Sequence, residues 1–204
     1  MVVTEETIAT ERIYEGVILN LRRDKVTVRD GRTSYREIVE HNGGVAIAAL
    51  TADGKMPMVR QFRKSAEAAM LEVPAGKTER GETDLRAVAA RELKEETGYT
   101  AGRLEYLMSF YTSIGYSTER LHLYLATELT PGETEFDENE AIENCAHSPD
   151  ELLEMIANGE IADAKTIIAV QAVKLRQSAL APPPAQTRRA AGGRDTAAAD
   201  SESR

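Results

Sequence analysis

The amino-acid sequence predicts an α/β (α+β) fold in which mixed β-sheets are sandwiched between helices. Three observations predict it. Residues 13–62 contain alternating apolar side chains and Asp-Gly pairs, as β-hairpins do. Residues 83–97 are rich in Ala, Leu, Arg, Lys and Glu, which favour a helix. Further strand-like and helix-like segments follow, so sheets covered by helices are the expected packing for this chain of 204 residues.

The first hairpin is predicted around Asp30-Gly31, a pair that favours a two-residue turn. Residues 26–29 and 32–39 flank this pair as its two strands. Upstream, residues 13–22 show another apolar alternation, which predicts a further strand or two. The N-terminal region is therefore expected to be β structure.

A buried strand is predicted over residues 45–51, which are apolar enough to be covered on both faces. Asp53-Gly54 is the second turn signal in the chain. We expect residues 56–62 to return from this turn and to pair with the buried strand.

The central helix is predicted to begin at Glu82 or Thr83 and to stop at Gly98. Asp84 is favourable near the positive end of such a helix. Strands are predicted after it over residues 104–111 and 121–127.

Two helices are predicted near the C-terminal end of the chain. Residues 148–158 begin with the Ser-Pro-Asp-Glu pattern of a capping box. Residues 163–177 carry enough apolar side chains to pack against a sheet. We therefore divide the chain into an N-terminal β region (1–40), a main domain (41–178) and a tail (179–204). The tail is rich in Ala, Pro, Arg, Gly and Ser and is predicted to be disordered.

Three glutamates make the central helix a candidate metal site. Glu92, Glu95 and Glu96 are spaced i, i+3 and i+4, so their side chains emerge on one face. Carboxylates this close repel one another, and a hard cation such as Mg2+, which prefers oxygen ligands, removes that cost. The alternative is a solvated surface helix on which Arg91 and Lys94 neutralise the acids.

The residues around these glutamates resemble the signature of a known family. Gly76, Glu82 and the segment Arg-Glu-Leu-Lys-Glu-Glu-Thr-Gly, which ends at Gly98, are similar to the Nudix box of the Nudix hydrolase family. The resemblance implies a loop–helix–loop that holds Mg2+, or Mn2+ in its place, against a diphosphate. One departure is the spacing: eight residues, 83–90, separate Glu82 from the arginine of the box, where the family pattern has seven.

The resemblance also implies roles for individual residues. Glu92, Glu95 and Glu96 would bind the metal, together with the backbone carbonyl of Ala75. Arg91 would orient the carboxylates, and it belongs with Glu95 to the expected catalytic group.

Other motifs are similar to the ADP-ribose pyrophosphatase branch of the family over roughly residues 10–178: ERIYEG, SYREIVEH, VRQFRK and LEVPAG. This resemblance implies that Arg36 and Arg63 contact the substrate and that Glu72 is an acid of the substrate site. It also makes Tyr14 a candidate for stacking on adenine. For each arginine the alternative is an ordinary solvated strand position.

Two loops bear on the reaction. In the resembling branch, an acidic loop corresponding to residues 136–141 carries the catalytic base, so Glu138 or Glu140 is the expected base. A solvated loop is the alternative. In the loop 112–117, Ile114 stands where the branch has a proline, which leaves the choice of nucleoside diphosphate open.

The composition argues against several other classes. A net charge of −9 disfavours nucleic acid as a partner. The single Cys145 cannot form an internal disulfide, which fits a reducing cytoplasm. The first residues do not have the pattern of a secretory signal, and no apolar stretch reaches the roughly 20 residues that span a bilayer. We therefore expect a cytoplasmic protein without a membrane partner.

The resemblance implies an enzyme, a Nudix-type diphosphatase that uses Mg2+ to hydrolyse a nucleoside diphosphate linked to another group, with ADP-ribose, which gives AMP and ribose 5-phosphate, as the first candidate. The substrate is a small nucleoside diphosphate derivative. The resemblance also implies a homodimer, with residues 1–40 as the candidate region for dimer formation. Hydrolysis of another nucleotide sugar, or a non-catalytic nucleotide-sensing module, are the alternatives.

Overall fold

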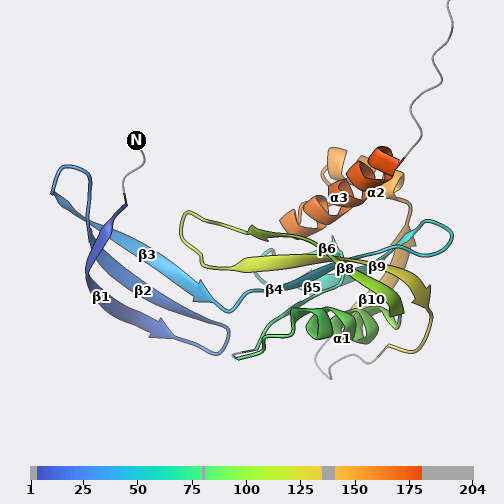
Figure 1. The fold of residues 1–204 in the computed structure, drawn as a ribbon, viewed down its shortest axis with the longest axis horizontal. Coiled ribbons are helices and arrows are strands. Elements are labelled where there is room, and N and C mark those ends of the chain that lie inside the picture. Colours follow the sequence, from blue (N-terminus) through green and yellow to red (C-terminus); the bar gives the residue numbers. More distant parts are fainter. Residues whose placement is uncertain (1–3, 80, 135–140, 181–204) are drawn as a thin grey trace, which may run out of the picture.

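The computed structural model of the chain describes residues 4–79, 81–134 and 141–180. Two β-sheets pack between helices, and a third sheet stands beside them (Figure 1). The elements in chain order are β1 (Glu6–Glu15), β2 (Leu19–Thr27), β3 (Thr33–His41), β4 (Gly44–Ala49), β5 (Met56–Arg63), β6 (Ala68–Glu72), β7 (Ala75–Lys77), α1 (Leu85–Thr97), β8 (Thr100–Tyr111), β9 (Arg120–Thr130), β10 (Ile142–His147), α2 (Pro149–Ala157) and α3 (Ala164–Leu180).

The N-terminal sheet is an antiparallel meander in the order β1-β2-β3. The predicted hairpin forms around Gly31, whose φ of 79° is the left-handed conformation that glycine adopts readily. Its loop covers residues 28–32 instead of the predicted two, because the pairing of β2 with β3 ends at Thr27 and Thr33. The further strands predicted over 13–22 are the end of β1 and the start of β2. The chain turns between them, where the N–H of Gly16 donates to the carbonyl of Leu19 (3.1 Å).

The central sandwich consists of a four-stranded sheet, β7-β4-β9-β8, and a three-stranded sheet, β10-β5-β6. β4 runs parallel to β9, and the other neighbouring strands are antiparallel. Every residue of β4 is buried, as predicted for this segment.

The predicted pairing of the strand after Asp53-Gly54 with β4 is wrong. β5 pairs with β6 and β10 in the other sheet. Both edges of β4 are already occupied, by β7 and β9. The turn itself forms, with the N–H of Thr51 donating to the carbonyl of Lys55 (2.9 Å), and it carries the chain from one sheet to the other.

Helices cover both sides of the sandwich, α1 on one side and α2 with α3 on the other (Figure 1). The alternation of β4 explains why both sides are apolar. Val45 and Ile47 pack in one core cluster with residues of α1, whereas Ala46 and Ala48 pack in a second cluster with residues of α2 and α3. The predicted class, mixed sheets between helices, is confirmed.

The ends of the helices follow local capping chemistry. α1 begins after Asp84, and not at Glu82 or Thr83 as predicted. The Asp84 carboxylate caps the helix by accepting from the N–H of Ala87 (3.0 Å). It ends at Gly98 as predicted, with a left-handed φ of 75°. The capping box of α2 forms as predicted between Ser148 and Glu151.

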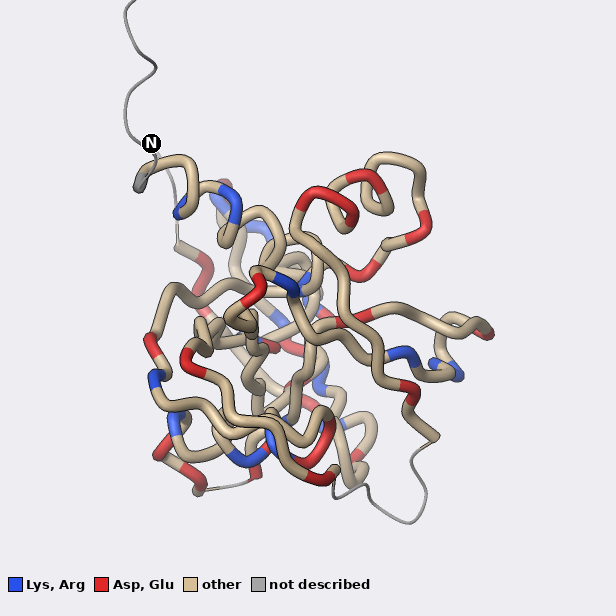
Figure 2. The backbone as a smooth tube through the Cα atoms, turned by 90° about the vertical axis from the view of Figure 1, so that its right-hand side faces the viewer, with Lys and Arg blue, Asp and Glu red and all other residues tan. Residues whose placement is uncertain are grey.

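Acidic and basic residues are interspersed along the described chain (Figure 2). Among the described residues, no helix is long and apolar enough to cross a membrane. α3 continues to Leu180, so residues 179–180, which we assigned to the tail, are helical. The rest of the predicted tail lies outside the described residues.

Candidate active site

The three glutamates of α1 occupy one face of the helix and differ in burial. Glu96 is 6% exposed, and the side chains of Glu92 and Glu95 are 14% and 33% exposed. The face therefore turns partly into the protein, unlike the solvated helix of the alternative interpretation. A carboxylate this deeply buried requires compensating donors or cations.

Arg91 connects two of these glutamates. One guanidinium nitrogen lies 2.7 Å from Oε1 of Glu92, and another lies 2.7 Å from Oε2 of Glu95. Burial lowers the pKa of Arg91, but the two carboxylates outweigh burial and the pKa is raised from its ordinary value. Arg91 thus stays charged, and its planar guanidinium group fixes the positions of the two carboxylates.

The short strand β7 brings backbone groups to the same face. The N–H of Ala75 donates to Oε2 of Glu96 (2.9 Å). Gly76 lies so close to Glu92 that an added Cβ atom would stand 2.0 Å from the carboxyl carbon. Glu92 and Glu96 therefore contact the backbone on either side of the Ala75 carbonyl.

These residues fit a divalent cation. The donors are carboxylate oxygens and a peptide carbonyl, the hard ligands that Mg2+ and Mn2+ take, and Gly76 leaves the space in which Glu92 approaches the backbone. Among the described residues, no three acidic, His or Cys side chains are already gathered closely enough to hold a metal. The carboxylates of Glu92 and Glu95 form ion pairs with Arg91, and the carboxylate of Glu96 accepts from the N–H of Ala75. These separate partners reduce the repulsion between the three negative charges.

The loop before α1 is held by its own contacts. Glu82 is exposed, and its carboxylate accepts from the N–H of Glu79 (3.0 Å), so it shapes the loop. Thr78 ties the loop to the end of β3, because its hydroxyl donates to the carbonyl of Asn42 (2.9 Å) and its N–H donates to that of Gly43 (3.1 Å).

Beside the glutamate face lies a buried ion cluster. Glu72, only 2% exposed, accepts two hydrogen bonds from Arg63 (2.7 and 2.8 Å) and one from Lys165. The hydrogen bond to Glu72 raises the pKa of Arg63, to which the charge of Glu96 also contributes. Burial works against ionisation of Glu72, but Arg63 and Lys165 together hold its pKa below the ordinary value.

Lys165 was not predicted from the sequence. It lies 93 residues after Glu72, at the start of α3, and no local pattern singles it out. The two come together because the start of α3 docks next to the end of β6, where the N–H of Val73 donates to the hydroxyl of Thr166 (3.0 Å).

Arg36 and Tyr14 lie on the N-terminal sheet. Arg36, on β3, pairs with Glu5 and donates to the hydroxyl of Ser34 (3.0 Å). Tyr14, on β1, is 57% exposed. All hydrogen bonds of Arg36 to described residues stay within this region, so within one chain it is not joined to the glutamate face.

Of the two loops expected to bear on the reaction, the structure describes the loop 112–117 but not residues 136–140 of the acidic loop. The loop that carries Ile114 is hydrogen bonded to β3, with Val39 donating to Tyr116 (2.7 Å) and Thr118 donating to Val39 (2.9 Å). Ile114 itself is 81% exposed. Glu138 and Glu140 lie outside the described residues, so the assignment of the base stays a prediction.

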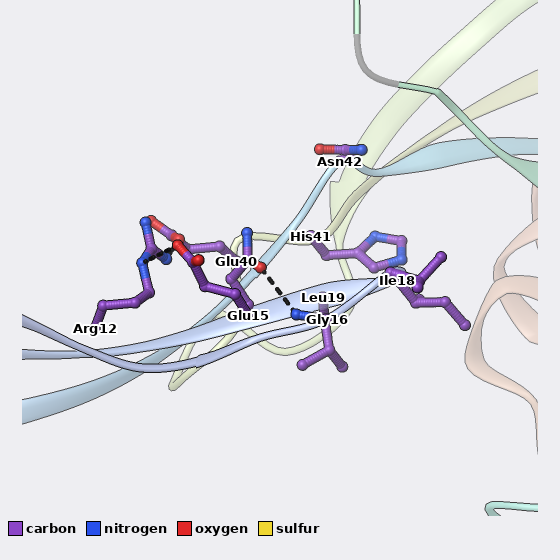
Figure 3. A pocket seen from close by; sticks show the side chains of 10 residues that line it. Arg12, Glu15, Gly16, Ile18, Leu19, Glu40, His41 and Asn42 are labelled. Atoms are coloured by element: carbon purple, nitrogen blue, oxygen red, sulfur yellow. Dashed lines mark hydrogen bonds and ion pairs between the residues drawn. The ribbon is translucent and has the colours of Figure 1, made fainter.

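A cavity of about 660 Å3 opens where the β1–β2 turn meets the end of β3 (Figure 3). Arg12, paired with Glu40, lines it together with His41 and Asn42. Among the residues that the structure describes, no predicted site residue lines this cavity. The oxygen donors that suit a divalent cation lie instead on α1 and beside Ala75.

The chain is similar to known proteins in sequence and in fold. The profile of the NUDIX domain matches residues 40–170. The chain belongs to the NUDIX family. The resemblance drawn from residues 91–98 is thereby confirmed, and with it the enzyme class, a Nudix diphosphatase. Enzymes of this family depend on divalent metal ions.

The chain is similar to curated relatives over most of its length. It is 45% identical to a methanol dehydrogenase activator of Bacillus methanolicus and 43% identical to an ADP-ribose pyrophosphatase of Bacillus subtilis (strain 168), in each case over 85% of this chain and 95% of the relative. A solved structure, described as an ADP compounds hydrolase, superposes with a TM-score of 0.77 at 19% identity. The superposition covers 88% of this chain and 97% of the solved chain, which shows that the two share a fold.

Proposed function

We propose that this NUDIX enzyme hydrolyses the diphosphate of ADP-ribose and releases AMP and ribose 5-phosphate, with Mg2+ as its cofactor. The observation that carries the proposal is the seating of Glu92 and Glu96 against Ala75 and Gly76, within a chain that is 43% identical to an ADP-ribose pyrophosphatase. The −9 net charge of the protein would repel an anionic substrate, so a bound cation or a local arginine cluster has to offset it.

The residues of α1 would hold the cation. Glu92, Glu95 and Glu96, with the carbonyl of Ala75, supply its oxygen ligands, and Arg91 keeps two of the carboxylates oriented. When bound, the cation neutralises the charge of the diphosphate and lowers the pKa of a water molecule. Glu138 or Glu140 is the base that accepts the proton of that water.

Arginines are proposed to bind the remaining charge of the substrate. Arg63 is the first candidate, because its side chain is 42% exposed although its partner Glu72 is buried. Its planar fork suits phosphate oxygens. Arg36 and Tyr14, on the N-terminal sheet, are proposed for the phosphates or terminal ribose and for adenine, respectively.

A substrate panel tests the proposal. ADP-ribose, a GDP-sugar and a UDP-sugar are incubated with the enzyme and Mg2+, and AMP, GMP, UMP and phosphosugars are measured. We expect equimolar AMP and ribose 5-phosphate from ADP-ribose, and none when EDTA removes the metal. Absence of ADP-ribose cleavage in a folded, metal-replete sample would refute the assignment.

A second candidate is hydrolysis of another nucleotide sugar. Ile114, in place of the proline of the resembling branch, is exposed on a loop joined to β3, so it could alter how that loop meets the sugar end. GMP or UMP produced faster than AMP would favour this candidate.

We further propose that the enzyme is a homodimer formed through its N-terminal sheet. The sheet stands beside the sandwich (Figure 1), and all of β1 is exposed in the single chain. Large apolar side chains, including Ile8, Ile13 and Val17, are among the exposed residues. Such an apolar surface fits a second copy, which would also explain how Arg36 could reach a site. Light scattering should give twice the 22.3 kDa chain mass, and the Ile13→Asp variant should give a monomer.

We also propose a cytoplasmic location. The only cysteine, Cys145, is half-buried, and burial raises the pKa of its thiol. An unreactive thiol without a disulfide partner suits a reducing compartment. Fractionation of cells that produce the protein would test the location.

A further inference from the structure

The buried carboxylate of Glu72 is neutralised twice. Arg63 approaches it with two nitrogens (2.7 and 2.8 Å), and Lys165 approaches it with its ammonium group. Glu72 is 2% exposed and the Lys165 side chain 13% exposed, whereas the Arg63 side chain is 42% exposed. One cation is therefore part of the interior, and the other faces solvent.

Lys165 is fixed at the start of α3 by a chain of hydrogen bonds. Its ammonium lies 3.0 Å from the carboxylate of Asp163. The same oxygen of Asp163 accepts from the N–H (3.0 Å) and the hydroxyl (2.6 Å) of Thr166. The hydroxyl of Thr166, fully buried, accepts from the N–H of Val73 (3.0 Å). The first turn of α3 is thus tied to the strand end that continues into Ala75 and Gly76.

The two cationic partners of Glu72, Arg63 and Lys165, differ in whether they can turn away from its carboxylate. If Arg63 turned towards an anion in solvent without a second cation present, it would leave a buried carboxylate uncompensated, which is strongly unfavourable. Lys165 removes that penalty, because it stays beside Glu72. Glu72 keeps a charged partner in both positions of Arg63.

We propose that Lys165 is a positioning residue that frees Arg63 from Glu72 to bind the diphosphate of the substrate. The proposal rests on the proposed function, because it requires a phosphate-bearing ligand at this site. It assigns to Lys165 no contact with the reacting atoms. Loss of Lys165 locks Arg63 onto Glu72, so it weakens ligand binding without removing a ligand contact.

The test measures binding apart from turnover. The probe is the α,β-methylene analogue of ADP-ribose, in which a CH2 group replaces the bridging oxygen, titrated calorimetrically in the presence of Mg2+. We expect Lys165→Met to raise the Kd about tenfold. Lys165→Arg keeps a cation beside Glu72 and should restore most of the affinity. In steady state with ADP-ribose, KM should rise more than kcat falls.

Two further variants separate release from a purely structural role. Lys174→Met, on the same helix as Lys165, removes an ion pair with Asp150 of α2; it is the matched control and should leave the Kd unchanged. Glu72→Gln added to Lys165→Met removes the charge that holds Arg63, so the Kd should return towards the wild-type value. If Glu72 only braced Arg63 for binding, the double variant would bind more weakly than the single one, and the proposal would be overturned.

A measurement on the wild-type protein covers the case in which Lys165→Met does not fold. The Nε–H resonance of Arg63, assigned by its loss in Arg63→Lys, should shift when the analogue binds in the presence of Mg2+. An unchanged resonance in protein that binds the analogue overturns the proposal. Wild-type protein that neither binds the analogue nor cleaves ADP-ribose would instead refute the proposed function.

Discussion

The carboxylate of Glu92 lies against the backbone of Gly76, with its carboxyl carbon 2.0 Å from the point where a Cβ atom on Gly76 would stand. The φ of Gly76 is not positive, so backbone freedom does not explain this glycine. The close approach of a side chain 16 residues further along the chain does. The glycine of the box thus leaves the space for Glu92, a proposed metal ligand.

Gly76→Ala should therefore damage catalysis without unfolding the protein. The methyl group would displace Glu92, and a shift of about 1 Å in a catalytic group can cost about 10²-fold in rate. We expect a loss of that order in kcat/KM for ADP-ribose. Gly54→Ala, in the turn before β5, is the control, since an added Cβ there meets nothing within 4 Å and any strain from its φ of 81° bears on stability and not on the site. Equal activity of both variants would contradict the contact.

Arg91 should control the affinity for the cation. It spans Glu92 and Glu95 at 2.7 Å each, and loss of a residue that orients metal ligands typically costs about 10–100-fold in metal affinity. Arg91→Gln should shift the Mg2+ titration of activity to higher concentration by such a factor. Arg91→Lys should recover only part, because an ammonium lacks the planar fork. Arg86→Gln, an exposed position on the same helix, should show no shift.

Much of the fold could be predicted from local patterns. The burial of β4, the stop of α1 at Gly98 and the capping box at Ser148 each depend on a few neighbouring residues. The partner of β5 could not be predicted, because strand pairing depends on which edges are free in the whole sheet. A turn signal such as Asp53-Gly54 fixes a reversal of the chain and not the sheet that it enters.

In the candidate site, too, some features follow from local sequence patterns and others depend on how distant elements pack. The three glutamates share one helical face, so their spacing predicts their proximity. Lys165 depends on the docking of α3 and carries no local signal. Even Arg63 and Glu72, both named from the resemblance, gave no indication that they are bonded to each other.

Glu72 should make stability depend on pH. Its pKa is lowered in the folded protein, so its ion pairs stabilise the fold above the ordinary glutamate pKa of about 4.3 and are lost as the pH falls through the lower folded value. Urea unfolding of wild type and Glu72→Gln should show a large difference in free energy at pH 7. That difference should shrink below about pH 4. A difference independent of pH would mean that Glu72 is not ionised in the fold.

The acidic loop should supply the base. We expect either Glu138→Gln or Glu140→Gln, and not both equally, to lower kcat by about 10²–10⁴-fold with a smaller effect on KM. Glu138 is the preferred candidate, because it aligns with the base of the resembling branch. Steady-state kinetics of both single variants and the double variant test this. Near-normal kcat in all three would place the base within the box helix.

The cation site on α1 is tested most directly by measuring Mn2+ binding and AMP release on the same samples. Free Mn2+ is followed by electron paramagnetic resonance for wild type, Glu96→Gln and the control Glu154→Gln, an exposed glutamate of α2. We predict that Glu96→Gln retains its circular dichroism spectrum, binds Mn2+ at least about tenfold more weakly and loses most AMP release, while the control matches wild type. A folded Glu96→Gln protein that binds Mn2+ and releases AMP as wild type does would contradict the assignment of the glutamates of α1 as metal ligands.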